Sequence, residues 1–247
     1  MRVIFLGTNG WYETATGNTL SVLVETSGYN IVLDAGSGFF RLDGLIDRAK
    51  PVYLLLSHFH MDHISGLHGL SKIKCPKGLS IVGQEGTRGI INTLVRRPFT
   101  VPLENLGYST DILELPVDEG RVPFELEYLP MLHSDPCLGY RITADGKSIA
   151  FCTDTGYCEN AVKLAHEADL LITECAFRPG ETDSGWPHLN PETAARIAVE
   201  SGAKRLALTH FDAARYFTLE ERAEAESVAR EIFPGAFAST DLMELEI

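Results

Sequence analysis

The sequence predicts an α/β fold built from two halves, each a β-sheet with helices. Apolar segments of strand length recur along the chain and end in an aspartate and a glycine turn, as at 31–38 and 150–156. A second pair, "YLLLSHFH" at 53–60 and "LALTHFD" at 206–212, also shares its pattern. Chance similarity between strand ends is the alternative explanation of these repeats. Segments with helix start and stop signals complete the α/β pattern.

The first strands can be placed in order from residue 1. Three segments alternate and turn like consecutive strands: 3–9, 18–26 and 29–36. The apolar run at 52–56 is typical of a buried strand, and it leads into the loop "SHFHMDHISG" at 57–66. Residues 96–130 are rich in proline and have no clear period, so we expect either a lid or an irregular edge there.

The later elements have clear turn and capping signals. Residues 134–153 predict a hairpin with Asp145-Gly146 at its turn. A helix begins at the N-cap Asn190 and stops at Gly202, and its inner face is apolar: Ala194, Ile197 and Ala198. The last helix is bounded by a capping box and a stop: Thr218 with Glu221, and Phe233 before Pro234-Gly235.

Composition narrows the class of protein. The 247 residues include 21 Lys and Arg against 34 Asp and Glu, and the net charge of −13 disfavours nucleic acid as a partner. No apolar run is as long as a membrane span, and the start of the chain does not resemble a signal peptide. Five cysteines without a C-x-x-C pair indicate a reducing compartment. We therefore expect one cytoplasmic domain over 1–247, without a membrane partner, and a homodimer remains open.

The loop at 57–66 concentrates coordinating side chains: His58, His60, Asp62 and His63. A transition metal needs three or four such donors within about 2.0 to 2.3 Å. His58 and His60 alternate on the loop and can aim at one ion, whereas Asp62 and His63 lie further along and would aim at a neighbouring point. Four donors from one loop therefore suggest two adjacent ions.

The pattern H-x-H-x-D-H after a strand resembles the signature of the metallo-β-lactamase superfamily, and the resemblance spans nearly the whole chain. The other motifs of that family follow in order: Asp34 in "VLDAGSG", His133 in "LPMLHSD", Asp154 in "FCTDTG" and His210 in "LALTHF". The resemblance implies an αββα sandwich, in which two mixed sheets are flanked by helices.

The resemblance also implies a ligand set. One ion would bind His58, His60 and His133, the other would bind Asp62, His63 and His210, and Asp154 would bridge both. Asp34 would support the loop from behind. The two divalent ions would lie about 3.5 to 4 Å apart with a hydroxide between them. Nitrogen and carboxylate donors suit Zn²⁺ or Mn²⁺, with Fe²⁺ as a further option. This constellation implies hydrolysis but does not identify the bond.

The second half resembles the ribonuclease Z and small-molecule phosphodiesterase branch of the superfamily. The β-lactamase branch commonly has cysteine where this chain has Asp154. Three segments carry the likeness: "LLITECAF" (170–177), "HLNPETAARIA" (188–198) and "HFDAARY" (210–216). They imply that Glu174 orients His188, which would act with Asp62 in catalysis by protonating the leaving group or binding the phosphate. Alternatively, His188 is a loop residue beside Trp186-Pro187 without a role in catalysis.

Arginines near the motifs are candidates for phosphate binding. Arg215 and Tyr216 could contact the substrate, although one inserted residue changes their spacing from the branch pattern H-F-S-x-R-Y. Arg96 and Arg97 in the Pro-rich segment are further candidates. His68 and His166 are expected to be inert.

The chain departs from ribonuclease Z in one respect. Only 20 residues separate His133 from Asp154, which leaves no room for the long arm that grips transfer RNA. We therefore expect a small cyclic or linear phosphodiester as substrate. The alternatives are a nuclease that processes transfer RNA 3′ ends, a thioesterase or lactonase on the same ions, and a non-catalytic binder of a metal or metabolite.

Overall fold

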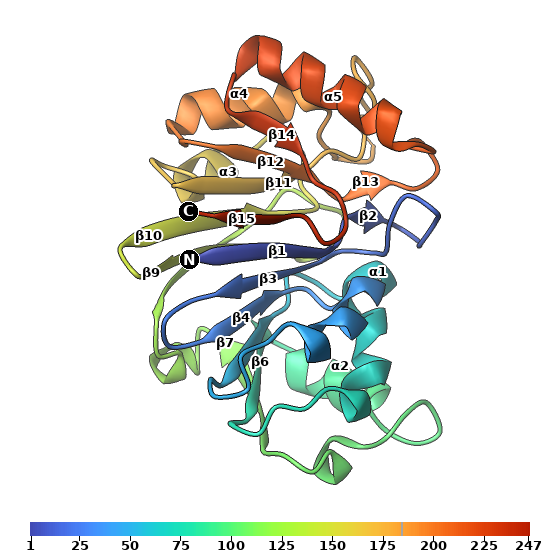
Figure 1. Cartoon of the computed structure of the whole chain (residues 1–247), viewed down its shortest axis with the longest axis vertical. Helices are drawn as coiled ribbons and strands as arrows, with labels where there is room; N and C mark the ends of the chain where they lie inside the picture. The colour runs from blue at the N-terminus through green and yellow to red at the C-terminus, as the bar shows by residue number, and fades with distance from the viewer. Residues whose placement is uncertain (184) are drawn as a thin grey trace.

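The computed structural model describes residues 1–183 and 185–247. Two β-sheets face each other, and helices cover the outer face of each (Figure 1). The predicted αββα sandwich with two mixed sheets is thus confirmed. The first sheet has seven strands in the spatial order β15 (Glu244–Glu246), β1 (Arg2–Gly7), β3 (Ser21–Glu25), β4 (Asn30–Leu33), β5 (Val52–Leu55), β6 (Leu79–Gln84) and β7 (Thr110–Leu115).

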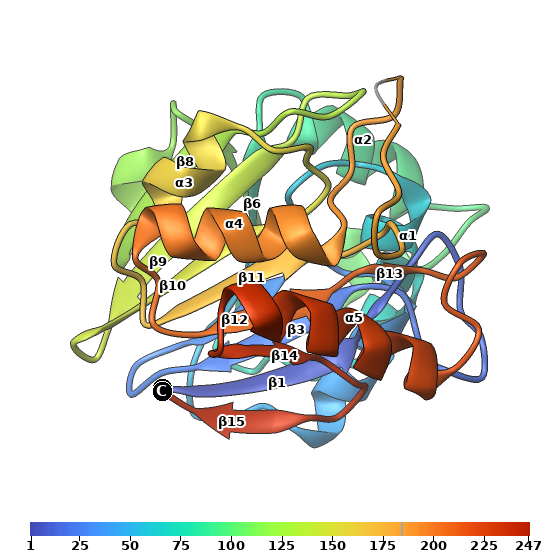
Figure 2. The same ribbon diagram turned by 90° about the horizontal axis from the view of Figure 1, so that it is seen from above.

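The second sheet has six strands, of which β10, β11, β12 and β14 run parallel. Its spatial order is β14 (Ala236–Ala238), β12 (Leu206–Thr209), β11 (Leu170–Glu174), β10 (Lys147–Cys152), β9 (Leu138–Ala144) and β8 (Glu125–Pro130). A separate two-stranded sheet pairs β2 (Asn9–Gly10) with β13 (Phe211–Asp212). The loops around β2 and β13 lie beside α1 (Met61–Ile64) at one edge of the sandwich (Figures 1 and 2).

The helices form the two outer layers. The second sheet is covered by α3 (Glu159–Leu164), α4 (Pro191–Ser201) and α5 (Leu219–Ile232). The first is covered by α1, α2 (Thr87–Leu94) and two 3-10 helices, η1 (Ser37–Gly44) and η2 (Ser65–Lys72). Two further 3-10 turns are η3 (Leu103–Asn105) and η4 (Glu119–Arg121). Within the described ranges, each helix is too short or too polar to cross a lipid bilayer.

The central strands are buried on both faces, because each strand separates two hydrophobic layers. In β1, Val3 and Phe5 point between the two sheets, and Ile4 and Leu6 point towards the helices of the first layer. The strand β10 repeats the pattern on the other side: Ile149 and Phe151 face inward, and Ala150 and Cys152 face α3 and α4. Side chains alternate along a strand, so continuous apolar runs such as 52–56 are what a middle layer requires.

The sequence signals for turns and caps are confirmed. The Asn190 side chain accepts a hydrogen bond from the backbone N–H of Thr193 (2.8 Å) and begins α4. Thr218 and Glu221 form the predicted capping box of α5. Asp145 and Gly146 both have positive φ and join β9 to β10.

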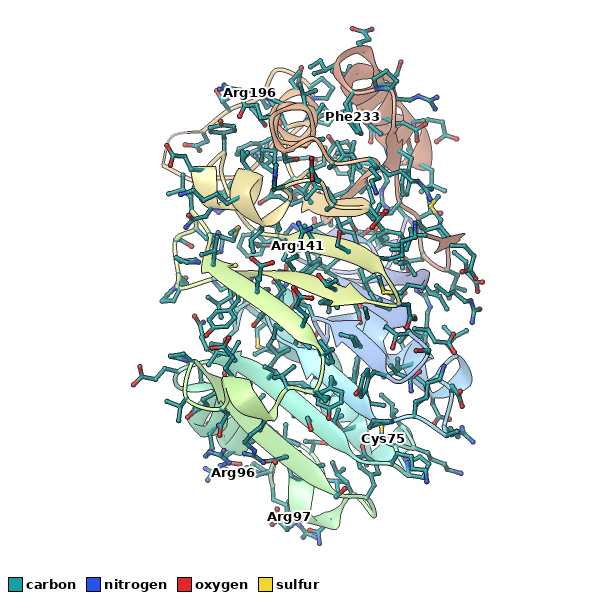
Figure 3. The ribbon with its side chains drawn as sticks, turned by 90° about the vertical axis from the view of Figure 1, so that its left-hand side faces the viewer. Cys75, Arg96, Arg97, Arg141, Arg196 and Phe233 are labelled. Atoms are coloured by element: carbon teal, nitrogen blue, oxygen red, sulfur yellow. The ribbon has the colours of Figure 1, made fainter. Side chains whose placement is uncertain are left out.

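The Pro-rich segment 96–130 contributes edges rather than a lid. It contains β7 and β8, which are the last strands of the two sheets. Arg96 and Arg97 project from the end of the molecule opposite Arg196 of α4 (Figure 3), and they do not line the pocket between the predicted ligands. The structure therefore does not bring these two arginines to the predicted ligands.

The polar residues that end the parallel strands converge. Asp34 follows β4 and Ser57 follows β5, while Asp154 and His210 follow β10 and β12 of the second sheet. Asp34, Asp154 and His210 adopt left-handed backbone conformations, with φ of 57°, 50° and 51°. Such values are unusual outside glycine. They turn the chain sharply as each strand ends, which brings the three side chains into the space at the edge of the sandwich.

The capping box of α5 should contribute measurably to stability. Thr218→Ala removes the acceptor for the Glu221 N–H (3.3 Å), and such a loss costs about 1 kcal/mol. For a domain of this size, the thermal midpoint should fall by about 2 to 4 °C. Glu220→Gln on the same exposed turn is the control, and calorimetry of both variants is the measurement. A Thr218→Ala midpoint equal to that of the control would contradict the assigned cap.

Candidate metal centre

The loop after β5 is anchored by the carboxylate of Asp34. Asp34 is fully buried and accepts hydrogen bonds from the backbone N–H and Oγ–H of Ser57 (both 2.7 Å) and from Nδ1 of His63 (2.8 Å). Nδ1 of His58 lies 3.0 Å from the Ser57 hydroxyl. These contacts use the Nδ1 atoms and set the ring orientations. The Nε2 atoms of His58 and His63 are left to face the carboxylate of Asp154, an arrangement common in metal sites.

One group of donors surrounds a point on the His133 side of the pocket. His58, His60, His133 and Asp154 each offer an atom, and these atoms lie within 4.8 Å of one another. Nε2 of His133 is 3.4 Å from Nδ1 of His60. The Oδ2 atom of Asp154 lies 3.7 Å from Nε2 of His58 and 3.9 Å from Nε2 of His133.

A second group lies on the His210 side. Donor atoms of Asp62, His63 and His210 also fall within 4.8 Å of one another. The two Nε2 atoms of His63 and His210 are 3.2 Å apart, and Oδ2 of Asp62 is 3.2 Å from Nε2 of His210.

Asp154 faces both groups with different oxygens. Its Oδ2 faces His58 and His133, whereas its Oδ1 lies 3.3 Å from Nε2 of both His63 and His210. A carboxylate placed in this way can bridge two cations. The structure therefore brings together all seven predicted ligands, in the two sets that the resemblance implied.

The residues fit a pair of divalent ions. Two donors that share a tetrahedral ion at about 2.1 Å lie about 3.4 Å apart, and the separations above range around that value. Nε2 of His58 is buried without a hydrogen-bond partner. Burial and the neighbouring His63 lower the pKa of His58 to about 2, so this imidazole is neutral at neutral pH and able to coordinate. A buried, unpartnered nitrogen of this kind is otherwise costly.

Three contacts that position ligands escaped the sequence analysis. Nε2 of His60 pairs with Asp135 (2.9 Å), which leaves its Nδ1 for an ion. The backbone N–H of Trp11 donates to Oδ2 of Asp62 (2.7 Å). Gly10 gives the His210 ring its space, because a Cβ there would lie 2.6 Å from the ring. Only Asp135 had a local signal, since it follows His133 by two residues.

The predicted pair of Glu174 and His188 is formed. Nδ1 of His188 lies 2.7 and 2.9 Å from the two carboxylate oxygens of Glu174. The buried carboxylate also accepts backbone N–H groups from Thr155 (2.6 Å) and Leu189 (3.2 Å). Burial lowers the pKa of His188, but the Glu174 carboxylate outweighs that effect and raises it to about 9. The imidazolium form is therefore favoured at neutral pH.

A pocket of about 220 Å³ opens beside the donors. It is lined by metal-binding candidates, by His188 and by two indoles; its residues are Trp11, His60, Asp62, His133, Ser134, Asp154, Trp186, His188 and His210. None of these described residues is a lysine or an arginine. The pocket would therefore attract an anion through the cations that its ligands hold and through the imidazolium of His188.

The expected substrate contact by Tyr216 is wrong. Its side chain is fully buried, and its hydroxyl donates to the carbonyl of Phe177 (2.6 Å), away from the pocket. The guanidinium of Arg215 is taken up by Glu181 (2.9 Å) and Asp212 (3.0 Å), and Arg215 does not line the pocket either. The segment "HFDAARY" has one residue more than the branch pattern H-F-S-x-R-Y, and its Arg215 and Tyr216 side chains lie away from the pocket. His68 and His166 do not line this pocket.

Comparisons with known proteins agree with this arrangement. Residues 29–211 match the family model described as "Beta-lactamase superfamily domain". The probable metallo-hydrolase YhfI of Bacillus subtilis (strain 168) is 29% identical over 216 residues, which cover 85% of this chain and 86% of that protein. The crystal structure of the metallo-beta-lactamase fold protein YhfI from Bacillus subtilis aligns with a TM-score of 0.82 and 24% identity, and covers 100% of this chain and 98% of the other.

A ribonuclease Z from Methanosarcina mazei is 26% identical over 312 aligned positions, which cover 100% of this chain and 98% of that protein. The 312 positions exceed the 247 residues of this chain, so that relative carries segments without a counterpart here.

Two substitutions should separate the two groups of donors. Gly10→Ala places a Cβ against the ring of His210, a member of one group, so the metal content should fall from about two ions per chain towards one. Asp154→Ala removes the group that faces both sets, so both ions should be lost. Elemental analysis after dialysis against trace Zn²⁺ or Mn²⁺ is the measurement. Gly28→Ala is the control, because a Cβ at Gly28 meets nothing within 4 Å. Two retained ions in Asp154→Ala would rule out the bridging role.

Proposed function

The chain belongs to the beta-lactamase superfamily, and from that membership we propose that it is a metal-dependent hydrolase that cleaves small cyclic or linear phosphodiesters with two divalent ions. The observation that carries the proposal is the carboxylate of Asp154 between two sets of donors, next to a pocket that also contains His188. The first feature supports a pair of ions, and the second supports a substrate whose leaving group needs a proton.

The chain's own residues would divide the work. When bound, two divalent ions supply a water with a pKa lowered to about 7 and offset charge on the phosphoryl oxygens. The Trp11 N–H donates to the Asp62 carboxylate and holds it beside His210, where it would help to bind and orient the attacking water. Nδ1 of His188 is engaged by Glu174, so Nε2 is the ring nitrogen that can serve the substrate. A protonated His188 would donate from Nε2 to the leaving alkoxide.

Size and charge favour a small diester over transfer RNA. The pocket is small and its described lining has no lysine or arginine, and the chain carries a net charge of −13. The segment between His133 and Asp154 is occupied by the β9–β10 hairpin. A transfer RNA nuclease remains the second candidate, because the Methanosarcina mazei relative is named ribonuclease Z.

A single assay separates the reaction classes. Turnover of bis(p-nitrophenyl) phosphate without turnover of an acyl thioester or a lactone would support the diesterase. The reverse result would assign a thioesterase or lactonase to the same ligands, and no turnover of any of them would favour a non-catalytic binder. The Glu174–His188 pair argues against that last option, since a binder of metal or metabolite has no use for a proton donor.

Loss of the proton donor should depend on the leaving group. His188→Ala should lower kcat by about 10²- to 10⁴-fold for an alkyl leaving group, and less for p-nitrophenolate, which scarcely needs a proton. Metal content should be unchanged by elemental analysis. His166→Ala is the matched control, because His166 is exposed and outside the pocket. Equal losses for good and poor leaving groups would contradict proton donation.

Glu174→Gln should produce the same pattern more weakly, with a change in pH dependence. The carboxylate raises the pKa of His188, so its removal lets the imidazolium lose its proton at a lower pH. The alkaline limb of the rate profile should therefore move to lower pH, whereas a purely structural role would leave that limb in place.

The preference for small substrates is tested by salt. Each phosphate contact made by a lysine or arginine adds to the salt dependence of binding. We expect kcat/KM for a small diester to change only modestly between about 50 and 200 mM salt, and precursor transfer RNA to be cut poorly. Efficient cleavage at the 3′ side of the acceptor stem, with a steep loss on adding salt, would assign the chain to transfer RNA processing instead.

A further inference from the structure

Two tryptophans stand at the mouth of the metal pocket, although they are far apart in sequence. Trp11 follows β2, and Trp186 lies in the loop before α4. Their ring centroids are 5.9 Å apart with an interplanar angle of 40°, and both side chains line the pocket. The two indoles therefore form a continuous aromatic wall, which we call the Trp11–Trp186 wall.

The Trp186 half of the wall is held in place from behind. Its ring makes edge contacts with Phe177 (5.7 Å, 74°) and with His188 (4.3 Å, 72°). The guanidinium of Arg215 lies over both Phe177 (4.9 Å) and Trp186 (5.9 Å), and is itself fixed by Asp212 and Glu181. Arg215 thus acts as a support for the indole rather than as a phosphate ligand. A ring held from several sides loses little freedom when it binds a partner.

The Trp11 half is tied to the metal ligands through its backbone. Its N–H donates to Asp62 from a residue with φ of 68°. Trp11 as a whole residue is 57% exposed, which leaves a large hydrophobic residue in contact with water beside a polar centre. Because the backbone holds Asp62 and the side chain does not, the indole is free to serve another purpose.

The charge of the pocket limits what else could recognise a substrate. No lysine or arginine is among its described lining residues, so the cation that the protein itself offers there is His188, which acts at the leaving group. The ions would engage the scissile phosphate whatever its substituents are. The large aromatic surface in the described lining is the Trp11–Trp186 wall, and stacking on such a surface contributes about 1 to 3 kcal/mol per nucleobase.

We propose that the Trp11–Trp186 wall selects phosphodiesters that carry a planar aromatic ring, such as a nucleobase, next to the scissile phosphate. This inference rests on the proposed diesterase activity and names its substrate class. The ring stacks against the indoles while the phosphate reaches the ions that Asp154 and the neighbouring histidines would hold. Substrates with the same phosphate but a small aliphatic substituent bind the ions alone.

The test compares pairs of substrates that differ only in the ring. One pair is adenosine 2′,3′-cyclic phosphate against methyl β-D-ribofuranoside 2,3-cyclic phosphate, which share the ribose and the cyclic diester and differ in the nucleobase. The other is uridine 2′,3′-cyclic phosphate against the same methyl riboside, which repeats the comparison with a smaller planar ring. For the holoenzyme, kcat/KM should favour the ring-bearing member of the pair by about 5- to 150-fold, the equivalent of 1 to 3 kcal/mol.

Substitutions of the wall should remove that ratio. In Trp11→Leu and Trp186→Leu the ratio should fall towards one, whereas Trp11→Phe should keep most of it. Tyr12→Leu is the matched control, because Tyr12 is an exposed aromatic residue on the same loop that does not line the pocket. The ratio is informative even if Trp186→Leu disturbs His188, since that effect lowers both members of a pair alike.

The outcomes distinguish this inference from the function on which it rests. Equal kcat/KM within both pairs, or a ratio unchanged in both Leu variants, would overturn aromatic selection while the diesterase stands. Absence of turnover with every diester would overturn the proposed function, and the inference with it.

Discussion

A carboxylate removed from water has to meet positive charge, and Asp154 is the residue of this chain on which that constraint falls most heavily. It is almost fully buried, and four imidazole nitrogens face its two oxygens. Burial opposes its ionisation, yet the imidazoles, His210 foremost, hold its pKa well below the usual range. An ionised, buried carboxylate surrounded by nitrogen donors is stable when cations complete the cluster. The imidazoles around Asp154 replace the water that would otherwise stabilise its charge.

Much of the architecture serves to deliver those ligands. Sheets buried on both faces give rigid strands, and their parallel carboxyl ends meet at one edge, where ligands usually bind in α/β proteins. The left-handed residues at three strand ends then direct side chains inward. Such conformations cost of order 1 to 3 kcal/mol each and persist at functional sites where the surroundings enforce them. The hydrogen bonds of Asp34 and the space left by Gly10 provide that enforcement.

The sequence predicted the features that depend on residue type and on strand ends. The metal loop, the caps at Asn190 and Thr218, and the Glu174–His188 pair all have local patterns. The contacts that the sequence did not predict join residues distant in sequence, such as Trp11 with Asp62 and Trp11 with Trp186. Tyr216 was misjudged because a motif with one inserted residue does not say which side of the chain faces the pocket. The segment 96–130 was ambiguous because it combines two strands, β7 and β8, with the short 3-10 turns η3 and η4 and with proline-containing loops, so that no single period extends along it.

The division of the ligands between the two halves has a consequence for folding. The first half supplies the loop at 57–66, and the second supplies His133, Asp154 and His210. Neither half contains a complete site, so an ion bound between them acts as a cross-link across the sandwich. By mass action, free metal adds to the free energy of unfolding of the whole chain rather than of one loop. In a newly made chain, the group of His58, His60, His133 and Asp154 is complete once Asp154 has been synthesised, whereas the other group needs His210 at the end of β12, so the second ion would be captured last.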